Sequence, residues 1–327
     1  MIDGHGDDIY NYEDIRMNFS SNIYAHADLT ELEAYLCRHL DLIRSYPEPS
    51  SHSLEAMIAR EYGVDADEVL VTSGATDAIY LIAQAFRDRK TYYVNHPTFS
   101  EYEDACRLHG YEEQPDGALC WLCNPNNPTG EVYSGSYIEA LAAQHDMLVI
   151  DQSYEDYTPA LLLSPKEAVC MGNVLQLHSM TKQYAIPGLR MGYVMASSKL
   201  IATLRKHYRP WAVNVLAIEA GKWLLTHQPV FPNLMVYLRE TQRLREQLNA
   251  IKGVNAFDTQ TNFFLCTIEP QTAASLKDYL ATRHGILIRD AANFRGLTPH
   301  HFRIATQSPE ENDALVVAIQ QFITHPA

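Results

Sequence analysis

Lys182 stands in a stretch whose residue types could support covalent chemistry, residues 178–193, with the sequence HSMTKQYAIPGLRMGY. An apolar run at 174–177 precedes this stretch and is typical of a short β-strand. A lysine just beyond the carboxyl end of such a strand would lie where open α/β sheets bind their ligands. Burial lowers the pKa of a lysine, and its neutral amine can form a Schiff base with a carbonyl compound. We therefore predict a nucleophilic Lys182 with the cation Arg190 nearby.

Four other segments place polar or aromatic residues directly after predicted strands. Residues 73–76 form a small-residue turn that opens a helix, where free N–H groups and the helix dipole favour a phosphate. Residues 96–102 supply aromatic rings, and residues 124–130, NPNNPTG, are stiffened by prolines and can present an amide. Asp151 ends an apolar strand, and a buried carboxylate there needs a cationic partner. Taken singly, each segment also has an ordinary explanation as a turn, a core aromatic cluster or a helix cap.

Alternating strands and helices must position these segments. The hydrophobic pattern predicts strands at 69–72, 91–94, 118–123, 147–150, 174–177 and 192–196. Helices are predicted between them at 76–86, 100–108 and 137–144. Short apolar strands separated by helices indicate an α/β fold, with a mostly parallel sheet covered by helices on both faces.

The pattern changes after about residue 208. Long helices at 213–225 and 233–250 precede shorter strands at 262–268, 286–289 and 302–305, with helices near 273–283 and 310–323. This indicates a smaller α+β domain. We expect an N-terminal arm at 1–25 that folds against the small domain or across a partner subunit, a large domain at 26–208 and the small domain at 209–327.

Composition excludes several classes of function. The chain has 327 residues and a net charge of −15, which argues against nucleic acid as a partner. No apolar run is long enough for a membrane span. The acidic first residues are unlike a secretory signal, and the six cysteines show no disulfide framework, so we expect a cytoplasmic protein.

Together, the motifs resemble fold type I pyridoxal-phosphate enzymes of the class I/II aminotransferase superfamily. The resemblance covers nearly the whole chain. It rests on NPNNPTG at 124–130, on Asp151 and Tyr154, and on SMTK at 179–182 with the downstream Arg190, which occur in the family's order and spacing.

This resemblance implies a role for each matching residue. Lys182 would bind pyridoxal 5'-phosphate covalently, and Asp151 would pair with its ring nitrogen and keep the ring an electron sink. Asn127 and Tyr154 would bind the 3-oxygen of the ring, and Phe99, or alternatively Tyr102, would stack on it. The residues implied for the cofactor phosphate are Gly74, Ala75, Thr76, Ser179, Thr181 and Arg190.

Two further matches concern the partner subunit and the substrate. Tyr46, in SYPEP at 45–49, resembles a tyrosine that reaches the cofactor phosphate of the neighbouring subunit, which implies a homodimer with shared active sites. Arg303 matches the arginine that binds the substrate α-carboxylate, a task suited to its planar fork.

Within the superfamily, two families that act on phosphorylated amino compounds are the most similar: threonine-phosphate decarboxylase of cobalamin synthesis and histidinol-phosphate aminotransferase. The stretches that resemble the decarboxylase more are PTFSEY (97–102), LCNPNNPTG (122–130), TKQYAIPGLR (181–190), PWAVNVLA (210–217) and ILIRDAANFRGL (286–297). By this resemblance Arg289 would bind the substrate phosphate, assisted by His5, and Asn22 would also contact the substrate.

Some residues depart from these patterns. Gln152 stands where both families commonly have glutamate, and residues 23–25 lack the usual Asn-Pro pair. Tyr154 is aromatic, as in the aminotransferase. The decarboxylase is the first hypothesis because several stretches resemble it more, and an aminotransferase that uses 2-oxoglutarate or glutamate is the alternative.

Other motifs have simpler explanations. The SMTK match to the Ser-x-x-Lys motif of penicillin-recognising hydrolases lacks a downstream Lys-Thr-Gly. Cys120 and Cys123 would point to opposite faces of a strand, and the pair His300 and His301 is typical of a solvated loop, so we predict no metal site. A regulator with an aminotransferase-like domain would need a DNA-binding extension, for which this acidic chain leaves no room.

Overall fold

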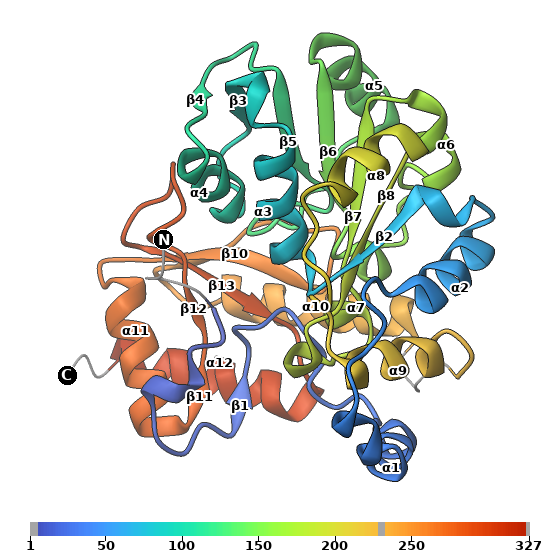
Figure 1. Ribbon diagram of the computed structural model, residues 1–327. Coiled ribbons are helices and arrows are strands. Elements are labelled where there is room, and N and C mark those ends of the chain that lie inside the picture. The colour runs from blue at the N-terminus through green and yellow to red at the C-terminus, as the bar shows by residue number, and fades with distance from the viewer. Residues whose placement is uncertain (1–5, 228–232, 325–327) are drawn as a thin grey trace.

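Two separate β-sheets organise the chain (Figure 1). The computed structural model describes residues 6–227 and 233–324. A seven-stranded sheet is built from strands between residues 69 and 196, and a four-stranded sheet from strands between residues 254 and 305.

The seven-stranded sheet is mostly parallel, because only β8 runs against its neighbours. In spatial order the strands are β2 (Val69–Thr72), β8 (Gly192–Ala196), β7 (Val174–His178), β6 (Met147–Asp151), β5 (Leu119–Cys123), β3 (Thr91–Val94) and β4 (Glu112–Glu113). Parallel neighbours need crossover connections, which the intervening helices provide. The predicted α/β class is confirmed.

Helices bury both faces of this sheet. In β5, Leu119, Trp121 and Cys123 face one core, while Cys120 and Leu122 face the other, as the two-residue period of a strand requires. The first core is covered by α3 (Ala75–Ala85), α4 (Glu101–Leu108) and α8 (Ser198–Arg205), and the second by α5 (Gly135–Gln144) and α6 (Pro165–Met171). A third cluster joins β2 and β8 to α1 (Thr30–Arg38), α2 (His52–Tyr62), α7 (Met180–Gln183) and α9 (Val215–Leu224).

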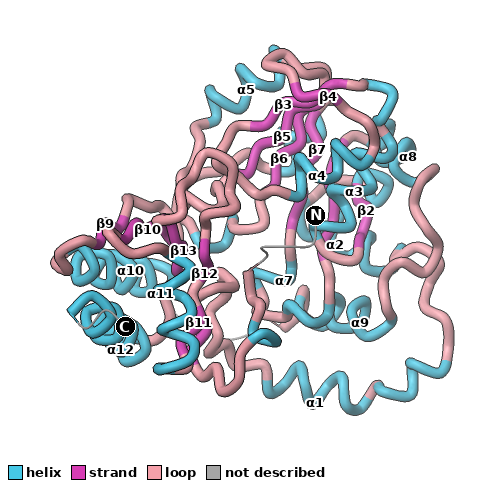
Figure 2. Tube along the Cα trace, turned by 90° about the vertical axis from the view of Figure 1, so that its left-hand side faces the viewer, coloured by secondary structure: helices cyan, strands magenta, loops and turns pink. Residues whose placement is uncertain are grey.

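The four-stranded sheet is antiparallel and lies to one side of the larger sheet (Figure 2). Its order is β12 (Arg289–Asp290), β13 (His301–Ala305), β10 (Phe263–Ile268) and β9 (Val254–Ala256). Its core is shared with α10 (Leu234–Asn249), α11 (Ala273–Tyr279) and α12 (Pro309–Thr324). The α+β pattern predicted after residue 208 is therefore present, while the domain boundaries at 25/26 and 208/209 stay a prediction.

The N-terminal arm is joined to this smaller sheet and its helices. β1 (Met17–Asn18) pairs in parallel with β11 (Ile286–Leu287). The next residue, Phe19, is fully buried among the apolar side chains of α10, β10 and α12, and its carbonyl accepts a hydrogen bond from Ala305 N–H at 2.9 Å. Asp8 forms an ion pair of 2.5 Å with the buried Lys277 of α11. These contacts hold the arm against the small sheet within one chain.

The prediction of a single strand at 286–289 is wrong, because this segment forms two short strands, β11 and β12. β11 pairs with the arm, whereas β12 pairs with β13. A change of partner between Leu287 and Arg289 leaves no periodic signal in the sequence, since all the residues from Ile286 to Arg289 are buried.

Short helical turns complete the described part of the chain. The 3₁₀ turns are η1 (Ile9–Asn11), η2 (Leu40–Arg44), η3 (Ala66–Glu68), η4 (Arg87–Arg89), η5 (Glu155–Tyr157) and η6 (Pro187–Leu189), and η7 (Leu280–His284) is a π-helical turn. Within residues 6–227 and 233–324, no helix has the length and apolar character needed to cross a membrane.

Candidate active site

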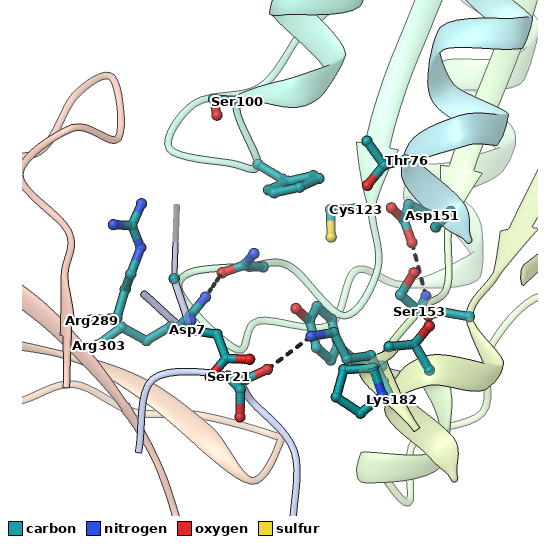
Figure 3. A pocket seen from close by; sticks show the side chains of 18 of the residues that line it. Asp7, Ser21, Thr76, Ser100, Cys123, Asp151, Ser153, Lys182, Arg289 and Arg303 are labelled. Atoms are coloured by element: carbon teal, nitrogen blue, oxygen red, sulfur yellow. Dashed lines mark hydrogen bonds between the residues drawn. The ribbon is translucent and has the colours of Figure 1, made fainter. Parts of the chain in front are cut away.

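A cavity of about 310 Å³ lies at the carboxyl ends of β5, β6 and β7 (Figure 3). Its walls come from these strand ends and the first residues of α3, from the N-terminal arm, and from β12 and β13. The larger sheet, the arm and the smaller sheet therefore all contribute side chains to one site.

Lys182 lies on α7, the short helix that follows β7, and its amine faces this cavity. The Nζ atom donates a hydrogen bond of 2.8 Å to the backbone oxygen of Ser21 in the arm. Burial, followed by the positive charge of Arg303, lowers the pKa of Lys182 to about 8. Roughly a tenth of the amine is therefore neutral at pH 7, and this neutral form can act as a nucleophile.

The backbone around Lys182 is held by the turn η5, which follows β6. The Tyr157 hydroxyl donates a 2.9 Å hydrogen bond to the carbonyl oxygen of Lys182. The fully buried ring of His178, at the end of β7, contacts the Glu155 carboxylate at 2.7 Å through Nδ1 and stacks on Tyr193. Gln183 Nε2 donates to Asp156 at 3.1 Å. These contacts fix the position of α7 on both sides of Lys182.

Groups that could bind an anion lie at the start of α3. Gly74 precedes the helix with a φ of +86°, and a Cβ built on it would lie 2.9 Å from Nη2 of Arg190. The absence of a side chain at Gly74 therefore allows the guanidinium to lie against the backbone at the N-terminus of α3. Arg190 donates a 3.2 Å hydrogen bond to the Pro187 carbonyl, and Ser179 and Thr181 line the same cavity.

Asp151 is the last residue of β6 and is 4% exposed. Its two oxygens accept hydrogen bonds from Tyr102 hydroxyl at 2.8 Å and from Ser153 N–H at 2.9 Å. It forms no ion pair with any residue that the structure describes, so a positively charged ligand atom would balance its charge.

The geometry distinguishes the two aromatic candidates for ring stacking. Tyr102 is fully buried, donates to Asp151 and stacks on Trp121 with ring centroids 5.3 Å apart. Phe99 is half-buried, lines the cavity and meets Tyr102 edge to face. Tyr102 also lines the cavity, but its ring is stacked on Trp121 and its hydroxyl is bound to Asp151, so Phe99 is the better candidate for a contact with a bound ring.

Asn127, Tyr154 and Arg303 form one buried polar group. The Arg303 guanidinium donates hydrogen bonds to Asn127 Oδ1 and to the backbone oxygen of Ser20. Burial raises the pKa of Tyr154 to about 12, although the neighbouring Arg303 opposes this shift. The Tyr154 hydroxyl therefore keeps its proton at neutral pH and can donate a hydrogen bond to a ligand oxygen.

Two buried arginines face the cavity from adjacent strands. Arg289 of β12 and Arg303 of β13 are direct cross-strand partners, and they are only 5% and 4% exposed. Burial lowers the pKa of each to about 10, and the charge of Arg289 contributes to the shift of Arg303. Like charges directly opposite each other destabilise a strand pair, so this arrangement favours an anionic ligand.

The structure brings most of the predicted site residues together around the cavity. The predicted residues that line it are Ala75, Thr76, Phe99, Asn127, Asp151, Tyr154, Ser179, Thr181, Lys182, Arg190, Arg289 and Arg303. Their individual roles stay predictions.

Four predicted residues are placed differently. Gly74 lies beneath Arg190 without lining the cavity. Asn22 is fully buried beside the Tyr154 side chain, with which it interacts, and it does not line the cavity. Tyr46 is 84% exposed and packs on Trp211, outside the cavity of its own chain. His5 lies outside the described residues.

From the arm, the sequence predicted only His5 and Asn22 as site residues, and neither is among the described arm residues that line the cavity. Gly6, Asp7, Ser20 and Ser21 line the cavity, together with Phe294 from the loop after β12. Arg289 lies over the Phe294 ring at 5.3 Å and donates a 2.8 Å hydrogen bond to Asn293. The signal that could have pointed to the arm is the run of polar residues on both sides of the apolar Phe19.

The donor set of the cavity fits pyridoxal 5'-phosphate. The N-terminus of α3, Arg190, and the hydroxyls of Ser179 and Thr181 can hold a phosphate. The carboxylate of Asp151, which has no ion-pair partner in the described part of the chain, can balance a protonated ring nitrogen.

Comparisons with known proteins agree with this geometry. The family model for aminotransferases of class I and II matches residues 14–116 and 110–319. The crystal structure of L-threonine-O-3-phosphate decarboxylase from Porphyromonas gingivalis has a TM-score of 0.89 to this chain and 37% sequence identity, and the match covers 95% of this chain and 100% of that one.

Two proteins compared by sequence are similar over almost their whole lengths. The threonine-phosphate decarboxylase of Salmonella typhimurium is 29% identical over 342 residues, which cover 94% of this chain and 91% of that protein. The histidinol-phosphate aminotransferase of Caldanaerobacter subterraneus is 25% identical over 343 residues, which cover 96% of each.

Proposed function

The chain belongs to the class I and II aminotransferase family, and from this premise we propose that it decarboxylates a phosphorylated amino acid, with L-threonine O-3-phosphate as the substrate. The observation that carries the proposal is the cross-strand pair of buried arginines, Arg289 and Arg303, which face the cavity together. One guanidinium can bind a carboxylate and the other a phosphate, each through its planar fork of N–H groups.

As a member of this family, the protein is an enzyme with pyridoxal 5'-phosphate as its cofactor. When bound, the cofactor accepts the electrons of a bond broken at the substrate Cα. Asp151 would keep the ring nitrogen protonated, while Arg190 with the N-terminus of α3 would hold the phosphate. The neutral amine of Lys182 is the nucleophile. After it has taken up the proton that the substrate ammonium group loses, its Nζ can deliver a proton to Cα once carbon dioxide has left.

The two arginines would also select the bond that breaks. Decarboxylation requires the Cα–carboxylate bond to stand perpendicular to the cofactor ring, whereas transamination requires the same of the Cα–H bond. Arg303 would hold the carboxylate and Arg289 the phosphate, so their positions fix the rotation of the substrate about Cα. The 37% identity to the Porphyromonas gingivalis enzyme supports decarboxylation, which would place this protein in cobalamin biosynthesis.

The second candidate is an aminotransferase of the histidinol-phosphate type. It is supported by the 25% identity to the Caldanaerobacter subterraneus enzyme and by the aromatic Tyr154, which shares a buried polar group with Arg303. Both candidates act on a phosphorylated amine, so the same cavity could serve either.

We also propose a homodimer with shared active sites in the cytoplasm. Tyr46 is 84% exposed, and the exposed side chains of Leu40, Ile43 and Trp211 are nearby in the chain or in contact with it. Such apolar exposure is typical of an interface, and a partner subunit could carry Tyr46 to the cofactor phosphate of this chain. All six cysteines are free thiols, which agrees with a reducing compartment.

The deciding experiment is to mix the cofactor-loaded enzyme with O-phospho-L-threonine and analyse the products with and without 2-oxoglutarate. Release of carbon dioxide and 1-aminopropan-2-ol phosphate without 2-oxoglutarate is the expected result. Deamination that depends on 2-oxoglutarate would contradict decarboxylation and support the aminotransferase, with histidinol phosphate as the next donor to test.

A further inference from the structure

The N-terminal arm brings a carboxylate, that of Asp7, into the cavity on the side of Lys182. Asp7 lines the cavity and is hydrogen-bonded to Ser20. The next residue, Ser21, accepts the hydrogen bond from Lys182 through its backbone oxygen (Figure 3). The negative charge of Asp7 opposes the downward shift of the Lys182 pKa, and does so more strongly than the charge of Asp151. Of the two carboxylates that line the described cavity, Asp7 is therefore the one more strongly coupled to Nζ.

Several contacts hold the Asp7 side chain in this place. Its N–H donates a 3.0 Å hydrogen bond to Ser20 Oγ, and its Oδ1 accepts one from Asn18 Nδ2. The next residue, Asp8, is paired with Lys277 at 2.5 Å. Asp7 itself has a φ of +61°, a conformation that costs free energy for a residue with a Cβ. Such a conformation persists when its surroundings impose it, and it is concentrated at functional sites.

The charges around the cavity are arranged in a pattern that a substrate could match. Asp151 is held by Tyr102 and Ser153 at the end of β6, where it faces the predicted cofactor position. On the substrate side, Arg289 and Arg303 provide two cations and Asp7 one anion. A phosphorylated amino acid has two anionic groups and one ammonium group, so these three side chains complement it in number and in sign.

The position of Lys182 indicates which substrate atom faces Asp7. The substrate nitrogen has to take the place that Lys182 Nζ occupies when the amine is exchanged. A side chain that faces Nζ therefore also faces the incoming nitrogen. Before the exchange, the ammonium group of the approaching substrate would be attracted by this carboxylate, while the phosphate and carboxylate of the substrate are bound by the arginines.

From this geometry we propose that Asp7 binds the ammonium group of the substrate and so selects phosphorylated amines over phosphate esters that lack an amine. The assignment rests on the proposed function, because it takes the substrate to be a phosphorylated amine. It also gives the arm a direct part in substrate recognition.

The test compares two ligands that differ only in the amine, 1-aminopropan-2-ol phosphate and isopropyl phosphate. Dissociation constants are measured by titration calorimetry on wild-type enzyme and on Asp7→Asn, which has nearly the same shape without the charge. In both proteins the cofactor is first fixed to Lys182 by borohydride reduction, so that the amine binds without reacting. We expect the dissociation constant of the amine to rise roughly tenfold or more, as for a lost hydrogen bond to a charged group. Isopropyl phosphate should bind unchanged or more tightly, because a negative charge has been removed.

Two variants separate recognition from support of the arm. Asp7→Gly removes the carboxylate and can keep the positive φ without strain, so it should show the same selective loss for the amine. Asp8→Asn is the matched control, since it removes the adjacent carboxylate that pairs with Lys277 and does not line the cavity. It should change the affinity for both ligands by the same factor.

The outcomes distinguish this proposal from the proposed function. If wild-type enzyme binds both ligands and Asp7→Asn changes both affinities equally or neither, Asp7 does not recognise the ammonium group, although the proposed function stands. If wild-type enzyme binds neither phosphate ligand, the proposed substrate class fails, and the role of Asp7 fails with it.

Discussion

Arg289 and Arg303 show how much of the substrate choice depends on single residues. Both are almost completely buried and both face the cavity as cross-strand neighbours. Each has at least one fixed partner, Asn293 for Arg289 and Asn127 for Arg303, which orients the guanidinium before a ligand arrives. Their separate positions suggest separate tasks, which kinetics can resolve.

Replacing Arg289 by alanine should impair phosphorylated substrates selectively. The KM for O-phospho-L-threonine should rise at least roughly tenfold, because a hydrogen-bonded charge pair is lost. The KM for unphosphorylated L-threonine should change little. Steady-state kinetics with both compounds provide the measurement, and an equal rise for both would remove the phosphate role from Arg289.

The lowered pKa of Lys182 leads to a prediction for pH dependence. Only the neutral amine reacts with the aldehyde of the cofactor, so its capture by the cofactor-free protein should accelerate about tenfold per pH unit below about 8 and level off above it. An ordinary lysine would level off only above about 10.4. Stopped-flow absorbance after mixing with pyridoxal 5'-phosphate measures this profile.

Arg303 supplies the control for that profile. Its positive charge is the largest electrostatic contribution to the lowered pKa of Lys182 after burial. Replacing it by glutamine should therefore move the midpoint upward in pH. A midpoint that stays in place, or that lies near 10 in the wild-type protein, would show that Lys182 is not perturbed in this way.

At the scale of elements, the site depends on where secondary structures end. β6 ends at Asp151, β7 ends one residue before Ser179, and α3 begins directly after Gly74. Each boundary places its side chain at the same edge of the parallel sheet, since parallel strands present their carboxyl ends together. The short helix α7 then contributes Lys182, whose backbone carbonyl accepts a hydrogen bond from the Tyr157 hydroxyl of η5.

Substituting Gly74 by alanine tests the boundary at α3. The residue has a φ of +86°, and the new Cβ would lie 2.9 Å from the Arg190 guanidinium. We expect weaker cofactor binding and a loss of about 1–3 kcal/mol in folding or binding free energy. Fluorescence titration with the cofactor and thermal unfolding are the measurements. Gly135→Ala is the control, because Gly135 has no positive φ and a Cβ there would meet nothing within 4 Å.

The ends of the large-sheet strands could be predicted from sequence for a physical reason. A strand buried on both faces gives a continuous apolar run, so its end is marked by the first polar residue, as at Asp151. The pairing of the arm with the segment at Ile286–Leu287 leaves no such signal in the sequence. β1 and β11 are two residues long, and their pairing depends on contacts between distant parts of the chain. This is why Asp7, Ser20 and Ser21 could not be assigned to the cavity in advance.

At the scale of the whole molecule, the contacts of Tyr46 within its own chain do not account for the role that its match to the family implies. Tyr46 is 84% exposed, although its match to the family implies a contact with a cofactor phosphate. The nearby exposed rings and aliphatic side chains, Trp211, Leu40 and Ile43, agree with burial against a second subunit.

Mixing two inactive variants would reveal shared sites. Lys182→Ala loses the nucleophile, and Tyr46→Ala loses a phosphate contact from the partner subunit. If Tyr46 acts across the interface, a heterodimer of these two variants contains one site with both native residues. Random reassociation should then restore about a quarter of wild-type activity. Activity that stays at the mean of the separate variants would show that each subunit builds its site alone.

The pairing of β1 with β11 has a consequence for folding during synthesis. Phe19 and its neighbours emerge from the ribosome long before Ile286 and Leu287, their partners in the folded state. At typical rates of translation the delay is on the order of tens of seconds. During that time the nascent chain exposes the side chain of Phe19, which later becomes fully buried. The cavity can therefore form only after nearly all of the chain has been made, because residues between Gly6 and Ser21 and residues between Arg289 and Arg303 contribute to its walls.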